Sequence, residues 1–158
     1  SAKKDMGLLA MSYGNVYVAQ VALGANEKQT VQAFIEAERH DGPSIILAYS
    51  HCIAHGINMR TGPDIQKLAV ECGHWPLYRH NPAAADAGKN PLKLDSRKPT
   101  KSFAEFSYAQ NRFRMLQKSR PEEARKLAKL AQRDADERWN YYSQLAGMEM
   151  TPETSEEA

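Results

Sequence analysis

The fold of this chain is decided by one segment, residues 15–50, which reads NVYVAQVALGANEKQTVQAFIEAERHDGPSIILAYS. Its first part, 15–23, is rich in valine and alanine, and its last part, 44–50, is a continuous apolar run, so both predict strands buried in a sheet. Between them, Asn26 can cap a helix that is closed by Gly42. A strand, a helix and a strand with short joints predict a βαβ unit with a parallel pair of strands.

Elements on both sides extend this unit. A short helix is predicted over 5–13, with Asp5 as its N-cap. A loop over 51–62 follows the second strand, and the next helix, 63–73, begins with a proline, which is favoured at the first helical position. A last, shorter strand is predicted over 75–82. The fold class is therefore α/β, with a partial open parallel sheet.

The helix inside the βαβ unit is predicted to be amphipathic. Val31, Phe34 and Ile35 follow the i, i+3, i+4 spacing of one helical face. Glu38 occupies the next position of that stripe, so the apolar face is short.

The last third of the chain is predicted to be helical. Residues 83–101 hold prolines, a glycine and several lysines, which is typical of an irregular connection. Ser102 and Glu105 form the S-x-x-E capping box that opens a helix of about four turns. A second helix is predicted from Pro121 to about Ala146.

These two helices are expected to form a helical hairpin over 102–147, after an α/β part over 1–82. Five apolar side chains are expected to pack within the hairpin or onto the rest of the chain: Phe103, Phe106, Phe113, Leu127 and Leu130. In the second helix, Ala131 and Trp139 continue the expected stripe. The acidic end, 148–158, lacks aromatic residues and is predicted to be a disordered tail.

The amino-acid composition limits the classes of protein to which this chain can belong. The chain has 158 residues, about one domain, with 42% apolar and 25% charged residues. A formal net charge of +2 does not point to nucleic acid or a membrane surface. No apolar stretch approaches the ~20 residues of a membrane span, and the first residues do not form a signal peptide. Two cysteines make no disulfide framework, so a reducing, cytoplasmic setting is expected.

Cys52 is the candidate functional residue, because it directly follows the second predicted strand and open α/β sheets bind ligands at the carboxyl ends of their strands. It could be a small buried core residue or a nucleophile activated by His51 or His55, although no nucleophile-elbow motif is present. It could also bind zinc together with His55, Cys72 and His74, at a spacing that no standard zinc finger has. An iron–sulfur cluster normally needs four thiolates, and this chain has two. The pattern alone leaves these interpretations open.

Four blocks of the sequence, taken together, resemble one known family. They are GLLAMSYGNVYVAQVALG, GPSIILAYSHCIAHGINM, GHWPLYRHNP and GKNPLKLDSRKPTKSFAEFSYAQNRFRMLQ. In order, and without large gaps, they look like the C-terminal part of the single-chain pyruvate:ferredoxin (flavodoxin) oxidoreductases. The resemblance runs from about Lys3 to about Arg133. It implies the back half of a thiamine-diphosphate-binding domain, followed by terminal helices.

The resemblance also implies a chemistry. Enzymes of this family cleave pyruvate oxidatively with coenzyme A, using thiamine diphosphate and Mg²⁺, and pass electrons through [4Fe-4S] clusters to ferredoxin or flavodoxin. They are typically homodimers. The family's Y-x-x-C-I pattern is matched from Tyr49 to Ile53, which makes Cys52 the expected ligand of the cluster nearest the thiamine cofactor. The other three ligands would come from a different domain, and an imidazole of His51 or His55 would either hydrogen-bond a cluster sulfur or face solvent or a neighbouring domain.

One family feature is missing from this sequence. The Gly-Asp-Gly motif that binds the diphosphate and magnesium does not occur. We therefore expect a piece of a longer polypeptide, inactive alone, with no catalytic or cofactor-binding residue of its own and Cys52 as its one cluster ligand. Two alternatives are a non-catalytic α/β scaffold or binding module and a zinc-stabilised domain.

Overall fold

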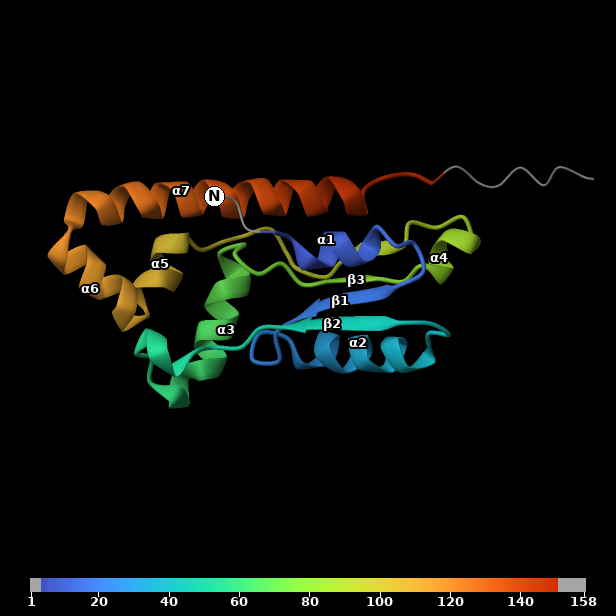
Figure 1. The fold of residues 1–158 in the computed structure, drawn as a ribbon, viewed down its shortest axis with the longest axis horizontal. Helices are drawn as coiled ribbons and strands as arrows, with labels where there is room; N and C mark the ends of the chain where they lie inside the picture. Colours follow the sequence, from blue (N-terminus) through green and yellow to red (C-terminus); the bar gives the residue numbers. More distant parts are fainter. Residues whose placement is uncertain (1–3, 151–158) are drawn as a thin grey trace, which may run out of the picture.

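The computed structural model describes residues 4–150, which form an α/β fold with a four-stranded open sheet (Figure 1). Helix α2 covers one face of the sheet, and α1 and the long α7 cover the other. The strands are β1 (Tyr17–Val21), β2 (Ser44–Ala48), β3 (Tyr78–His80) and β4 (Leu92–Leu94). The helices are α1 (Met6–Met11), α2 (Glu27–Arg39), α3 (Gly62–Glu71), α4 (Ala83–Asp86), α5 (Phe103–Tyr108), α6 (Asn111–Ser119) and α7 (Pro121–Ala146).

The βαβ unit and its parallel strand pair confirm the prediction made from residues 15–50. Strands β1 and β2 are parallel, with Tyr17 opposite Ser44 at the start and Val21 opposite Ala48 at the end. The sheet as a whole is mixed, however, because β3 runs antiparallel to β1 and β4 runs antiparallel to β3. Strand β4 lies in the segment 83–101, for which an irregular connection was predicted. A connection as short as the one from β3 to β4 can join neighbouring strands only if they are antiparallel.

Strand β1 is the centre of the fold and is buried on both faces. Val18 packs in one core cluster with Tyr78 of β3 and Tyr142 of α7. Ala19, the next residue, packs in a second cluster with Ala33 of α2. Successive side chains of a strand point to opposite faces, so β1 supplies both layers of the core.

Helix α2 forms where predicted, but its apolar stripe does not face the sheet. Asn26 caps the helix by accepting a hydrogen bond from the backbone N–H of Gln29 at 3.0 Å. The stripe residues Val31 and Phe34 are each 56% exposed, and Ile35 is 37% exposed. The face against the sheet is made of small and polar residues instead, namely Gln29, Thr30 and Ala33.

Strand β2 is an edge strand in the described residues, although its apolar run predicted a buried strand. It pairs with β1 on one side and with no described strand on the other. Ile45 is accordingly 40% exposed. An unpaired edge with apolar side chains is a surface that soluble proteins normally cover.

The C-terminal third consists of three helices where two were predicted. The capping box is confirmed, since the Ser102 hydroxyl accepts from the N–H of Glu105 and the Glu105 carboxylate accepts from the N–H of Ser102. The first predicted helix is divided into α5 and α6, and both lie beside the first half of α7. Helix α7 begins and ends where predicted.

Only some of the apolar residues that were expected to pack in these helices are buried. Phe103 and Phe106 are buried, and Phe113 is half-buried. Leu127 and Leu130 are instead 53% and 56% exposed. The buried positions of α7 are Ala124, Ala135 and Tyr142, so two of its three buried side chains are small. The predicted tail lies outside the described residues from position 151 onward.

Gly7→Ala in α1 is expected to destabilise the chain by about 1–3 kcal/mol, the usual cost of overpacking a core. A Cβ at this position would lie 1.8 Å from the Tyr78 hydroxyl oxygen and 3.0 Å from Cζ. In an open helix the same change would stabilise by about 1 kcal/mol, so the clash determines the sign. Urea unfolding of the single variant and of the double variant with Tyr78→Phe tests this. The cost should shrink when the hydroxyl is removed, and an equal cost in both backgrounds would contradict the prediction.

No helix within residues 4–150 combines the length and the apolar character needed to cross a membrane.

Candidate functional site

The candidate site is the loop that leaves the carboxyl end of β2 and leads to α3. Cys52 lies in its first turn, as the N-cap of a short 3-10 turn, Ile53–His55. The backbone oxygen of Cys52 accepts a hydrogen bond from the N–H of His55 at 3.1 Å. Gly56 closes the turn with a φ of 68°, a left-handed conformation that glycine adopts without strain.

The two cysteines have opposite environments. Cys72 is fully buried at the end of α3, where its Sγ donates to the backbone oxygen of Ala69 at 3.4 Å. Burial raises the pKa of the Cys72 thiol, which keeps it protonated and inert. Cys52 is free and exposed. The interpretation of Cys52 as a buried core residue is therefore wrong, whereas the same interpretation describes Cys72.

A thiol-specific reagent should label Cys52 and spare Cys72 in the folded chain. Access and thiolate content control thiol reactivity, and Cys72 lacks both. Intact-mass analysis after brief treatment with iodoacetamide should show one added group under native conditions and two in denaturant. Equal labelling of both thiols under native conditions would contradict this description of the site.

His51, which precedes Cys52, is held by helix α3. Its Nδ1 lies 3.2 Å from the Nε2 of Gln66, a half-buried residue. Gly62 allows the ring to approach this closely, because a Cβ there would lie 2.5 Å from the Cε1 and Nε2 atoms of His51. The ring is therefore fixed by one hydrogen bond and by contact with the start of α3.

His55, which ends the 3-10 turn, is held by the junction between α5 and α6. Its Nδ1 lies 2.6 Å from the Oε1 of Gln110, which is only 2% exposed. Its ring also meets Phe113 edge-to-face, with centroids 5.8 Å apart. Both histidines beside Cys52 are thus positioned by glutamines that the sequence analysis did not single out.

The structure does not assemble the four residues of the zinc hypothesis into a metal site. His74 stacks on Phe106 with ring centroids 5.1 Å apart, and Cys72 is enclosed in the same aromatic and aliphatic cluster. Within residues 4–150, no group of three or more His, Cys, Asp or Glu side chains is arranged to hold a metal ion.

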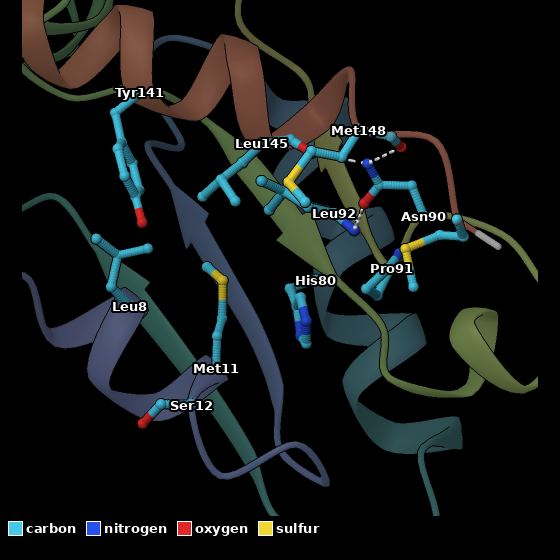
Figure 2. Close-up of a pocket in the computed structure, with 11 residues that line it drawn as sticks. Leu8, Met11, Ser12, His80, Asn90, Pro91, Leu92, Tyr141, Leu145 and Met148 are labelled. Carbon is cyan, nitrogen blue, oxygen red and sulfur yellow. Dashed lines mark hydrogen bonds between the residues drawn. The ribbon is translucent and has the colours of Figure 1, made fainter.

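A pocket lies elsewhere, between α1, β3 and α7, as Figure 2 shows. It has a volume of about 300 Å³ and mostly apolar walls, including Met11, Tyr141 and Leu145. His80, 8% exposed, borders it, and burial lowers the pKa of its imidazole. Asn90 closes one end by donating to the backbone oxygens of Leu145 and Met148. None of these residues lies near Cys52 in the sequence.

An iron–sulfur cluster shared with another part of a larger protein fits the residues around Cys52. The donor available here is one exposed thiol on the loop that follows the carboxyl end of β2. One thiolate is too few to hold a four-iron cluster, for which four are usual. The site is thus suited to donating a single ligand, and Cys52 as that ligand stays a prediction.

Comparison with known proteins gives many close relatives, although no protein-family model matches the chain. The chain is 62% identical over 144 residues to the pyruvate-flavodoxin oxidoreductase of Nostoc sp.. It is 53% identical to the pyruvate:ferredoxin oxidoreductase of Moorella thermoacetica and 46% identical to the pyruvate-flavodoxin oxidoreductase of Klebsiella pneumoniae. Each alignment covers at least 91% of this chain.

All of these relatives are oxidoreductases by name. The chain belongs to the family of pyruvate-flavodoxin and pyruvate:ferredoxin oxidoreductases, and it corresponds to their C-terminal part. It spans only 12–13% of the length of the relatives named above. The resemblance seen in the four sequence blocks is thereby confirmed.

Proposed function

We propose that this chain is the C-terminal segment of an enzyme that oxidises pyruvate with coenzyme A to acetyl-CoA and CO2. Two electrons leave the substrate and pass through [4Fe-4S] clusters to ferredoxin or flavodoxin. The names of the relatives support the substrate and the acceptors. The observation that carries the proposal for this chain is the exposed thiol of Cys52 within the Y-x-x-C-I pattern.

The role proposed for this segment is to bind and orient an iron–sulfur cluster. Cys52 would supply one thiolate to the cluster nearest the thiamine cofactor, and a second domain would supply the other three. When bound, the cluster accepts and passes on single electrons. The turn Ile53–His55 fixes the backbone of Cys52, so the segment would hold cluster and thiamine domain at a constant separation.

Thiamine diphosphate and Mg²⁺ would be bound by residues outside this chain, because the Gly-Asp-Gly motif is missing from it. Two exposed surfaces support the proposal that another part of the polypeptide packs here. One is the stripe Val31, Phe34 and Ile35 on α2, and the other is the unpaired edge of β2. Burying one such side chain contributes about 1.5–3 kcal/mol. A homodimer in the cytoplasm is proposed by analogy with the family.

The full-length protein, purified without oxygen, tests this function. We expect reduction of ferredoxin or flavodoxin that requires both pyruvate and coenzyme A, together with stoichiometric CO2. Omitting either substrate is the control. Iron-containing protein that reduces no acceptor with pyruvate would leave another 2-oxo acid to be tried. Protein that holds neither iron nor thiamine diphosphate would favour the α/β scaffold.

The 158-residue chain by itself is expected to bind neither magnesium–thiamine diphosphate nor iron. The reason is that it has no Gly-Asp-Gly carboxylate and, of its two cysteines, only Cys52 is exposed. Titration calorimetry with the cofactor and iron analysis after reconstitution check this. Tight cofactor binding by the isolated chain would refute the assignment of the cofactor site to another segment.

A further inference from the structure

Strand β2 has one edge that is hydrogen-bonded to β1 and one edge that meets no described strand. The N–H of Tyr17 donates to the backbone oxygen of Pro43 at 3.0 Å, and the N–H of Tyr49 donates to that of Val21 at 2.9 Å. Backbone groups alternate in direction along a strand, so every second residue from Pro43 to Tyr49 faces β1. The residues between them direct their backbone N–H and C=O groups to the open edge: Ser44, Ile46 and Ala48.

This open edge has none of the features that usually keep an edge strand from pairing. Natural edge strands are protected by charged side chains, by proline or by bulges. Strand β2 reads SIILA, with neither a charge nor a proline. Its register with β1 is continuous over all five residues, so it contains no bulge. The strand is therefore suited to the interior of a sheet.

The side chains of β2 lead to the same conclusion. Ile46 packs against the core cluster on the α2 side of the sheet. Ile45 points to the other face and is 40% exposed. An apolar run without alternation is typical of a strand that is buried on both faces of a parallel sheet. A neighbouring strand, with the helix that follows it, would satisfy the open backbone groups and cover Ile45.

The strand that pairs here comes from outside the described part of the chain. The residues directly before and after β2 lead to α2 and to α3, so neither side forms a hairpin with it. The chain corresponds to the C-terminal part of relatives of which it spans 12–13%. Most of the full-length polypeptide would therefore precede it, which is ample for the crossover of a dozen or more residues that parallel pairing requires.

We propose that a strand from the preceding part of the same polypeptide pairs in parallel with β2, through the backbone groups of Ser44, Ile46 and Ala48. Main-chain hydrogen bonds to an exposed edge are a common way to join two segments. Strand β2 would then lie inside the sheet of the whole protein. This inference deepens the proposed function by naming what packs on this edge, and it rests on that function only in taking the chain as a C-terminal segment.

Amide hydrogen exchange of the unmodified full-length protein, resolved to single residues by mass spectrometry, tests the pairing. We expect the N–H groups of Ile46 and Ala48 to exchange at least about 100-fold more slowly than in an unstructured peptide. The N–H groups of Leu47 and Tyr49 face β1 and are the internal control, since they are protected with or without a further strand. Fast exchange at Ile46 and Ala48 beside slow exchange at the two controls would overturn the inference.

Photo-crosslinking of the full-length protein identifies the occupant and its direction. The photoreactive residue p-benzoylphenylalanine replaces Ser44 in one variant and Ala48 in another, since both residues are exposed. Peptide mapping should find both crosslinks in one segment that precedes this chain in the same polypeptide. The residue joined to position 44 should come before the residue joined to position 48, as in parallel strands. The reverse order would overturn the parallel arrangement.

Other occupants of the edge would give different crosslinks. If β2 paired with β2 of a second copy, a mixture of unlabelled and heavy-nitrogen protein would give crosslinked peptides of mixed label, and the inference would fall. Crosslinks to a separate protein, or to another segment of this chain, would also overturn it. The proposed function fails separately. Slow exchange and the expected crosslinks in a protein that reduces no acceptor with pyruvate would support the strand pairing and contradict only the activity.

Discussion

Cys52→Ser in the full-length protein is expected to remove or degrade one iron–sulfur cluster while thiamine diphosphate still binds. The thiol is exposed after the carboxyl end of β2, and serine offers a harder oxygen where iron at low potential prefers anionic sulfur. Electron transfer to ferredoxin should fall at least about 10–100-fold, the loss that changes around a metal ligand already cause. Iron content, the spectra of the reduced clusters and cofactor affinity are the measurements.

Cys72→Ser is the matched control for this experiment, with the same chemical change at the other cysteine. Its side chain is fully buried in the core and donates to the backbone of α3, so every cluster should stay in place. A modest loss of stability is expected from placing a hydroxyl in an apolar cluster. A full iron count and unaltered cluster spectra in the Cys52 variant would show that Cys52 is not a ligand.

The proposed position of Cys52 has a functional reason. In the proposed enzyme, a thiolate from Cys52 would tie the electron-accepting cluster to the part of the protein that binds thiamine diphosphate. The 3-10 turn after Cys52 and the glutamine contacts of both histidines hold the loop around Cys52. A ligand whose supporting residues are themselves held by packing and hydrogen bonds keeps the geometry that a cluster would need.

The sequence alone was sufficient to predict those helices and strands that are determined by neighbouring residues. Strand β1, helix α2 with its cap Asn26, the capping box at Ser102 and the bounds of α7 all lie where their patterns predicted. Caps and turn residues act on their immediate neighbours, so their effect can be predicted without the tertiary structure. Strand β4 was missed, because three residues between a proline and a bend carry too little periodicity.

The periodicity of apolar residues located the apolar faces of α2 and α7, but it did not show what those faces pack against. On α2, Phe34 is exposed while Ala33 is buried against the sheet, and on α7, Leu130 is exposed while Ala135 is buried. Helices approach closely through small residues, and such contacts have weak hydropathy signals. Large apolar residues on the opposite face then form a surface that a partner can bury. A single sequence does not show which of the two faces of a helix packs against the core of the same chain.

The residues around the candidate site were only partly accessible to sequence reasoning. Cys52 could be selected because it follows a strand and matches a family pattern. Gln66 and Gln110 could not be selected in this way, because a glutamine side chain is uncharged and belongs to no periodic hydrophobic pattern. Their contacts with His51 and His55 span 15 and 55 residues of sequence. Only the folded arrangement of α3, α5 and α6 brings them to the loop.

The largest loss of stability is expected from Arg79→Met, at about 3–5 kcal/mol, as for breaking a buried ion pair. The side chain of Arg79 on β3 is 11% exposed and makes two hydrogen bonds of 2.8 Å to the carboxylate of Asp95. It also donates to Glu36 of α2. The hydrogen bonds to Asp95 raise the pKa of the guanidinium, which stays charged at every accessible pH. Methionine would leave two carboxylates without their cation.

The expected loss of stability in Arg79→Met depends on how deeply the ion pair is buried. An exposed ion pair in the same chain provides the control. Arg125 bonds to Glu122 at 2.9 Å, but their side chains are 71% and 77% exposed. Arg125→Met should therefore change the free energy of unfolding by about 0–1 kcal/mol. Arg79→Lys should fall between the two, because lysine keeps the charge but lacks the planar fork that meets Asp95. If urea unfolding shows equal losses for Arg79→Met and Arg125→Met, then Arg79 does not join β3, α2 and the residue after β4 as described.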